Sequence, residues 1–122
     1  MANDKSASAN LKYRAYCFSL QVARFVYAIP DRDKRVEVFM IQLLRCATSV
    51  GANIIEAQAG SSKKDFINFY HHALKSANET KFWLCLIRDL KICNTDEIKV
   101  LLSEADQVSR MIASSIMTMK KK

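Results

Sequence analysis

The sequence has very little glycine and proline, with 2 Gly and 1 Pro among 122 residues. β-Sandwiches and small barrels join many short strands by tight turns, and those turns depend on these two residue types. The scarcity therefore argues strongly against an all-β fold. Half of the residues are hydrophobic and 25% are charged, which is typical of a folded globular chain rather than a disordered one. A chain of this length is expected to form one domain.

The sequence also lacks any cysteine pattern typical of a metal or redox site. Cys17, Cys46, Cys85 and Cys93 include no Cys-x-x-Cys pair and match no zinc spacing. Each lies in an apolar stretch, where a free thiol behaves as a small hydrophobic side chain. The first ten residues are polar, and no apolar run approaches the roughly 20 residues of a membrane span. We therefore expect buried, reduced thiols in a cytoplasmic protein that does not enter a membrane.

Apolar residues recur at steps of three and four in four long segments, which is the spacing of amphipathic helices. The segments cover residues 11–29, 33–59, 63–91 and 96–119. Pro30 ends the first segment, and Gly60 suits the left-handed position that closes a helix. Helices with such short connections pack as antiparallel neighbours. The sequence thus predicts an all-α, up-down-up-down four-helix bundle over residues 11–119, with a disordered tail at 1–10 and a basic tail at 120–122.

Residues 47–52, with the sequence ATSVGA, are unusually small. Gly51 in a helix interior costs about 1 kcal/mol relative to alanine. A glycine retained there predicts that a second backbone approaches closely, and the alternative is a slightly weak helical turn.

The helices carry more apolar surface than one bundle needs, which is about three positions in seven. Phe69, Tyr70, Phe82, Trp83 and Leu86 span more than one face of their helix. Monomers rarely leave large apolar patches exposed to water. We therefore expect a second face to be buried against other copies of the chain, and the alternative is a thicker bundle that absorbs the whole of it.

No pattern in the sequence points to catalysis or to a metal site. His71 and His72 are adjacent, so on a helix they point about 100° apart and do not easily share a metal ion. The chain has no Glu-x-x-His motif, no Gly-rich phosphate loop and no nucleophile elbow. We expect a non-enzymatic protein without catalytic residues, metal or cofactor. An enzyme with sites formed between subunits stays open as an alternative.

Charge is the remaining signal, because 19 Lys and Arg against 12 Asp and Glu give a net charge of +7. Such an excess favours sequence-independent contacts with the phosphates of RNA or DNA, although it also lies within the ordinary range for solubility. Basic residues gather at the ends of the predicted helices. The predicted nucleic-acid contacts are Arg32, Lys34, Arg35, Lys63, Lys64, Lys120, Lys121 and Lys122. The alternative function is a structural or protein-interaction scaffold with no nucleic-acid role.

Three central stretches resemble the motifs of a known family. Residues 49–57, SVGANIIEA, resemble its S-x-x-x-N-I-A-E-G signature, and residues 62–66, SKKDF, resemble S-x-K-[DE]-F. Residues 73–80, ALKSANET, resemble A-x-G-S-x-x-E. The chain thus resembles the bacterial four-helix bundle proteins encoded in 23S rRNA intervening sequences, and it is similar to the accessory variability proteins of diversity-generating retroelements. Ala57 and Lys75 replace the two glycines of these motifs.

The resemblance implies a homopentameric barrel of four-helix bundles with a basic surface, nucleic-acid contact and no catalytic activity. For the retroelement type it implies a reverse transcriptase as partner.

We also expect a structural role for the polar residues of the family-like motifs. We expect Asn53, Glu56 and Glu79 to form buried hydrogen bonds or ion pairs that set helix register or subunit contacts, with a ligand site as the alternative. The expected partners are Arg45, Arg88 and the helix start near Lys64. Asp65 lies three residues after Ser62, which together resemble a capping box, and its charge suits the positive start of a helix.

Overall fold

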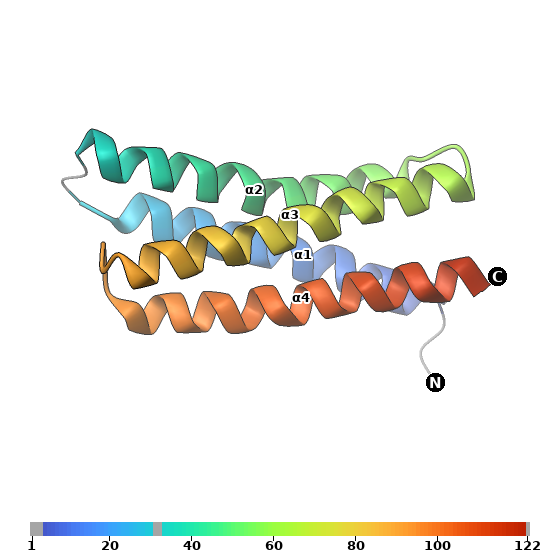
Figure 1. Cartoon of the computed structure of the whole chain (residues 1–122). Helices are drawn as coiled ribbons and strands as arrows, with labels where there is room; N and C mark the ends of the chain where they lie inside the picture. The colour runs from blue at the N-terminus through green and yellow to red at the C-terminus, as the bar shows by residue number, and fades with distance from the viewer. Residues whose placement is uncertain (1–3, 31–32, 122) are drawn as a thin grey trace.

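A computed structural model describes residues 4–30 and 33–121, which contain four α-helices and no strand. The helices are α1 (Asp4–Ala28), α2 (Lys34–Gln58), α3 (Lys63–Asp89) and α4 (Thr95–Lys121). Figure 1 shows them lying along one another, with short connections at alternate ends. At a rise of 1.5 Å per residue, each helix is roughly 40 Å long. The predicted all-α fold of four packed helices is confirmed.

Each helix packs on the next one along the chain, and α1 also packs on α4. Side-chain hydrogen bonds fix how α2 and α3 align. Thr80 of α3 meets Cys46 of α2, whereas Ser76, one turn earlier in α3, meets Ser49, one turn later in α2. A step forward along α2 is therefore a step back along α3.

The helix starts are capped by side chains. The Asp33 carboxylate accepts hydrogen bonds from the backbone N–H groups of Arg35 (2.9 Å) and Val36 (3.0 Å) at the start of α2. Ser62 Oγ accepts from the backbone N–H of Asp65 (3.1 Å) at the start of α3, as the motif predicts. Each cap satisfies donors that the first helical turn leaves without a partner inside the helix.

The role predicted for Gly60 is wrong, because neither glycine has a positive φ. A Cβ at Gly60 would lie 3.1 Å from the Ala57 carbonyl oxygen and 3.3 Å from Asp65 Cβ. The tight path between α2 and α3 explains this glycine instead. The left-handed conformation occurs at Lys91, with φ of 56°, just after α3.

Both ends of the chain are more helical than predicted. The prediction of a disordered tail over residues 1–10 is wrong for residues 4–10, because these residues belong to α1. These residues contain no glycine or proline to stop a helix, and Ala and Lys favour one. α4 likewise continues through Lys120 and Lys121, where cations favour the negative end of the helix dipole. Residues 1–3 and Lys122 lie outside the described residues.

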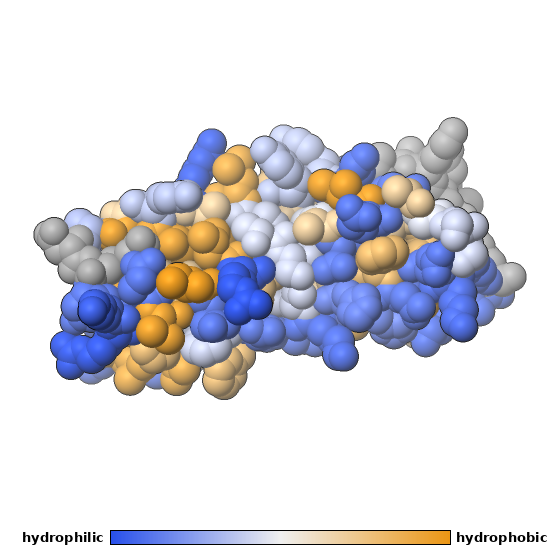
Figure 2. Space-filling view, turned by 90° about the horizontal axis from the view of Figure 1, so that it is seen from above, coloured by the Kyte–Doolittle hydropathy of each residue, from blue (hydrophilic) through white to orange (hydrophobic). Residues whose placement is uncertain are grey.

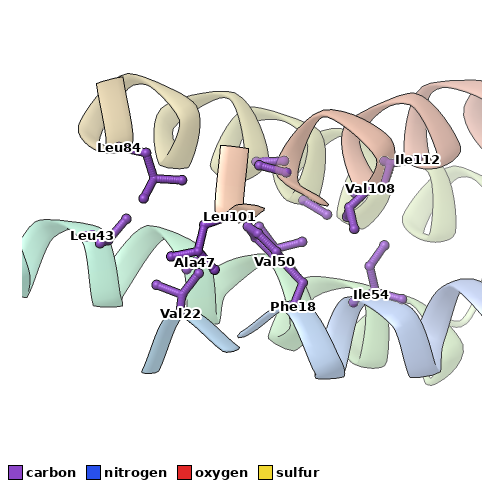
Figure 3. Close-up of a cluster of buried hydrophobic side chains, with 14 of the residues drawn as sticks. Phe18, Val22, Leu43, Ala47, Val50, Ile54, Leu84, Leu101, Val108 and Ile112 are labelled. Atoms are coloured by element: carbon purple, nitrogen blue, oxygen red, sulfur yellow. The ribbon is translucent and has the colours of Figure 1, made fainter. Parts of the chain in front are cut away.

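The core is made of one apolar stripe from each helix, and its side chains point into the common interior (Figure 3). The labelled members are Phe18 and Val22 of α1, Leu43, Ala47, Val50 and Ile54 of α2, Leu84 of α3, and Leu101, Val108 and Ile112 of α4. With Ala105 of α4, which is also buried, the core positions within each helix repeat at steps of three and four. The spacing read from the sequence therefore identifies the core.

Gly51 lies at a close contact between α1 and α2, as predicted, although the atom nearest to it is a side-chain hydroxyl rather than the backbone of α1. A Cβ at this position would lie 2.8 Å from Ser19 Oγ and 3.4 Å from the Ala15 carbonyl oxygen. Ser19 Oγ is held there because it donates a hydrogen bond to the Ala47 carbonyl (2.8 Å). The glycine therefore makes room for α1.

Substitutions at this contact should couple. Gly51→Ala alone should gain helix propensity but displace the Ser19 hydroxyl, whereas Ser19→Ala with Gly51→Ala removes the clash. We expect a coupling of about 1 kcal/mol in the free energy of unfolding, measured by urea denaturation of both single variants and the double variant. Additive effects would contradict the close contact.

Candidate nucleic-acid interface

The predicted cationic residues lie at opposite ends of the bundle. Lys34 and Arg35 begin α2 at the end that holds the α1–α2 connection, whereas the α2–α3 connection and the end of α4 lie at the other end (Figure 1). Arg32 and Lys122 lie outside the described residues. The eight predicted contacts therefore do not form one continuous site.

One end of the bundle gathers four lysines, which we call the basic end. Lys63 and Lys64 begin α3, and Lys120 and Lys121 end α4. All four are exposed. None makes an ion pair within the described residues. Their charge is therefore available to an external anion.

At the opposite end the charge is partly neutralised. Arg35 Nη2 lies 3.0 Å from Asp33 Oδ2 in an exposed ion pair. Two hydrogen bonds lower the pKa of the Asp33 carboxyl. The larger effect comes from the Val36 N–H, and the smaller one comes from the Arg35 side chain. Asp33 thus stays ionised near neutral pH and reduces the positive field around Arg35.

Acidic residues also neutralise cations along the sides of the bundle. Arg14 of α1 pairs with Glu104 of α4 at 2.7 Å and also donates to Gln107. Lys81 and Arg110 share Asp106, at 3.6 Å and 3.0 Å. These pairs join or border α4, so its flanks are closer to electrical balance than the basic end.

A seam of small polar side chains joins α2 to α3. Ser76 Oγ donates to Ser49 Oγ (3.0 Å), and Thr80 Oγ1 donates to the Ser76 carbonyl (2.7 Å) and lies 3.3 Å from Cys46 Sγ. Thr80 is fully buried. No motif in the sequence predicts a role for these hydroxyls. The available signal was that small polar residues stood at core-adjacent positions of two neighbouring helices.

The chain matches the family model described as "23S rRNA-intervening sequence protein" over residues 10–114. The chain belongs to this family. A similar solved structure is that of a protein of unknown function from the S23 ribosomal protein family of Bacteroides thetaiotaomicron. It is 28% identical, with a TM-score of 0.84, and the match covers 91% of this chain and 98% of that one. No curated protein matches the chain.

The polar residues of the family-like motifs are less buried than predicted. Glu56 and Glu79 are exposed, so the prediction of buried bonds is wrong for both. Neither Glu56 nor Glu79 belongs to the buried positions of α2 and α3 that form the core. Glu79 accepts a hydrogen bond from Trp83 Nε1 (3.1 Å) rather than pairing with an arginine, and Arg88 pairs with Asp89 (2.9 Å).

Asn53 and Asp65 of the motifs serve local structure. Asn53 is half-buried, and its Nδ2 donates to the Ser49 carbonyl (2.8 Å) and to Ser49 Oγ (2.9 Å). It therefore extends the α2–α3 seam. Asp65 accepts from Ser61 Oγ (2.8 Å) at the start of α3. A role of Glu56 and Glu79 in subunit contacts stays a prediction.

A small polar pocket of about 160 Å³ lies beside the seam. Its lining residues are Gln42, Arg45, Cys46, Ser49, Ser76 and Glu79. Within the described residues no group of three His, Cys, Asp or Glu side chains is placed to hold a metal ion. The pocket combines one cation, one carboxylate, one amide, one thiol and two hydroxyls. Cys46 contacts Thr80 and Glu79 contacts Trp83, so the thiol and the carboxylate each have another hydrogen-bond partner.

Three of the four cysteine thiols are less buried than predicted. Cys46 is buried, whereas Cys17, Cys85 and Cys93 are half-buried. Burial is the main cause that raises the pKa of the Cys46 thiol, and burial also raises the pKa of Cys93. A raised pKa leaves less thiolate at neutral pH, and the thiolate is the reactive form.

Cys46 should therefore resist labelling in the native protein. In a Cys17→Ser/Cys85→Ser/Cys93→Ser variant, reaction with a thiol-reactive disulfide reagent at pH 7.5 should be at least about tenfold slower than in denaturant. A variant that keeps only Cys17 is the control and should react readily when folded. Fast native labelling of Cys46 would contradict its placement between α2 and α3.

Proposed function

We propose that this chain is the subunit of a non-enzymatic homo-oligomer of antiparallel, up-down-up-down bundles that binds RNA or DNA without reading its sequence. The observation that carries the proposal is the basic end, where four exposed lysines have no acidic partner among the described residues. A homopentamer is the assembly implied by the resemblance to the 23S rRNA intervening-sequence proteins and the retroelement accessory proteins. Binding of a reverse transcriptase stays a prediction on the same ground.

The chemistry of the basic end suits phosphate. Lys63 and Lys64 lie in the first turn of α3, where backbone N–H groups and the helix dipole also favour an anion. Lys120 and Lys121 add two charges at the same end of the bundle (Figure 1). Lysines that neutralise phosphates release condensed counterions, so binding of this kind weakens steeply with salt.

Assembly would strengthen this binding. If the copies pack side by side around their long axis, their basic ends share one end of the assembly. The positive fields then add, and a nucleic acid contacts several copies at once. Weak nucleic-acid contacts made by single subunits would then add up to tight binding by the whole oligomer.

A protein-interaction scaffold is the second candidate, and a specific observation favours it. Several large apolar side chains are exposed, among them Tyr13, Tyr27 and Val100, which are 70%, 80% and 63% exposed. A docking face of this kind gives contacts that depend little on salt, whereas phosphate contacts lose affinity as salt rises. Salt dependence therefore separates the two functions.

Neutralising the basic end should weaken nucleic-acid binding. For Lys63→Gln/Lys64→Gln we expect the slope of log affinity against log salt to become shallower by about 1.5, because two phosphate contacts are lost. Fluorescence anisotropy with a short structured RNA between 50 and 200 mM salt measures it.

A matched variant separates a local site from overall charge. Lys34→Gln/Arg35→Gln removes the same two charges at the opposite end, and its slope should change less because Asp33 already neutralises Arg35. Equal changes in both variants would contradict a local basic site, and wild-type binding without salt dependence would contradict phosphate contact.

A further inference from the structure

The polar pocket between α2 and α3 lies midway along both helices, away from the basic end. Along α3, Ser76 of the pocket is about 18 Å from Lys64 at a rise of 1.5 Å per residue. Figure 2 looks down on the bundle from the side of α2, and pale, weakly polar atoms lie near the middle of this face. The four lysines of the basic end therefore give the pocket no role, and its residues need an explanation of their own.

Polar residues of two family-like motifs meet at this pocket. Ser49 begins the motif-like stretch of α2, and Ser76 and Glu79 belong to the one in α3. The two stretches come together because α2 packs on α3, with the Ser49 and Ser76 hydroxyls 3.0 Å apart. The α2–α3 seam accounts for the two serines. It does not account for Glu79, which is exposed and forms no ion pair within the described residues.

Hydrogen-bond donors at the pocket are left without an acceptor. A serine hydroxyl can donate one hydrogen bond and accept two. Ser49 Oγ accepts from Asn53 Nδ2 (2.9 Å) and from Ser76 Oγ (3.0 Å), and it donates to no group among the described residues. The Gln42 and Arg45 side chains beside it also have no polar partner in the part of the chain that the structure describes. The pocket thus offers an amide, a guanidinium and a hydroxyl proton to a ligand.

Charges of both signs line the pocket without joining. Arg45 comes from α2 and Glu79 from α3, and no ion pair links them. Glu79 Oε2 accepts from Trp83 Nε1 (3.1 Å), which leaves Oε1 for another donor. A simple anion would meet the carboxylate, and a simple cation would meet the guanidinium. A molecule that carries both charges can form a charge-assisted hydrogen bond with each.

The volume and the lining limit the size and polarity of that molecule. The pocket of about 160 Å³ holds roughly five water molecules at about 30 Å³ each. It is well below the roughly 300–1,000 Å³ of pockets for drug-sized ligands, so the bound molecule has on the order of five to ten non-hydrogen atoms. The described lining holds no aliphatic or aromatic side chain, so a large apolar group on the molecule would find no partner.

We propose that this pocket binds a free amino acid with a short, polar side chain. Arg45 binds the carboxylate of the ligand, and Glu79 accepts a hydrogen bond from its ammonium group. Ser49 and Gln42 bond its polar side chain. An amino acid carries the two charges on one carbon atom, which suits a small pocket with one cation and one carboxylate in its lining. This binding is a second function, independent of the proposed nucleic-acid contacts.

The single tryptophan of the chain reports on the site. Trp83 donates to Glu79, so its indole N–H signal in a proton–nitrogen correlation spectrum should shift saturably as L-serine is added. We expect a Kd on the order of 1 mM for so small a ligand. Arg45→Gln and Glu79→Gln should each weaken binding at least about tenfold, because each removes a charge-assisted hydrogen bond. Glu56→Gln, at an exposed glutamate outside the pocket, is the matched control and should bind as the wild type does.

Two shortened probes test whether both charges of the ligand are needed. Ethanolamine lacks the carboxylate of serine, and 3-hydroxypropionate lacks its ammonium group, so both should bind at least about tenfold more weakly. The proposal is overturned by the absence of a saturable shift with L-serine, L-asparagine and L-glutamine. It is also overturned if either shortened probe binds as well as serine, if Arg45→Gln or Glu79→Gln binds like the wild type, or if Glu56→Gln weakens binding as much as they do. Circular dichroism confirms that each variant is folded.

Discussion

The burial of one apolar stripe from each of four long helices is the interaction on which the rest of the structure depends. The described chain holds no disulfide and no metal-binding cluster that would substitute for it. α2 is central, because it packs on both α1 and α3. Its small residues let α1 approach at Gly51, and its hydroxyls align it with α3 at Ser76. Close packing on two sides fixes the register of three helices at once.

This arrangement determines where charge can lie. The core takes the inward apolar stripe of each helix. Acidic residues along α4 pair with Arg14, Lys81 and Arg110. The lysines without an acidic partner lie at the start of α3 and the end of α4. The proposed self-association along the sides and the proposed phosphate contacts at the basic end would therefore use separate surfaces.

Much of the fold could be predicted from the sequence, because helical spacing is a local property. The apolar steps identify the core, the Ser62 motif locates the start of α3, and Gly51 marks the close contact. The onset of α1 at Asp4 was missed, because a polar composition says little about whether a segment without glycine or proline stays helical. The spacing also suggests which residues share a helix, but not how well each lysine is separated from acidic residues on neighbouring helices.

The candidate site was harder to predict than the core. Lysines 63 and 120 are far apart in the sequence and reach the same end only because the helices reverse direction. Glu56 and Glu79 match a family motif, but a motif does not tell which side of a helix is inward. The α2–α3 seam depends on pairing between two helices, and no pattern within one segment reveals such pairing.

Native mass spectrometry of the purified chain with a short structured RNA, across a range of salt concentrations, tests most directly whether assembly and nucleic-acid binding use separate surfaces. We predict an oligomer that keeps its subunit number while RNA dissociates as salt rises. Apolar contacts tolerate salt, and phosphate contacts do not. A monomer at every salt concentration, or an oligomer that dissociates together with the RNA, would contradict it.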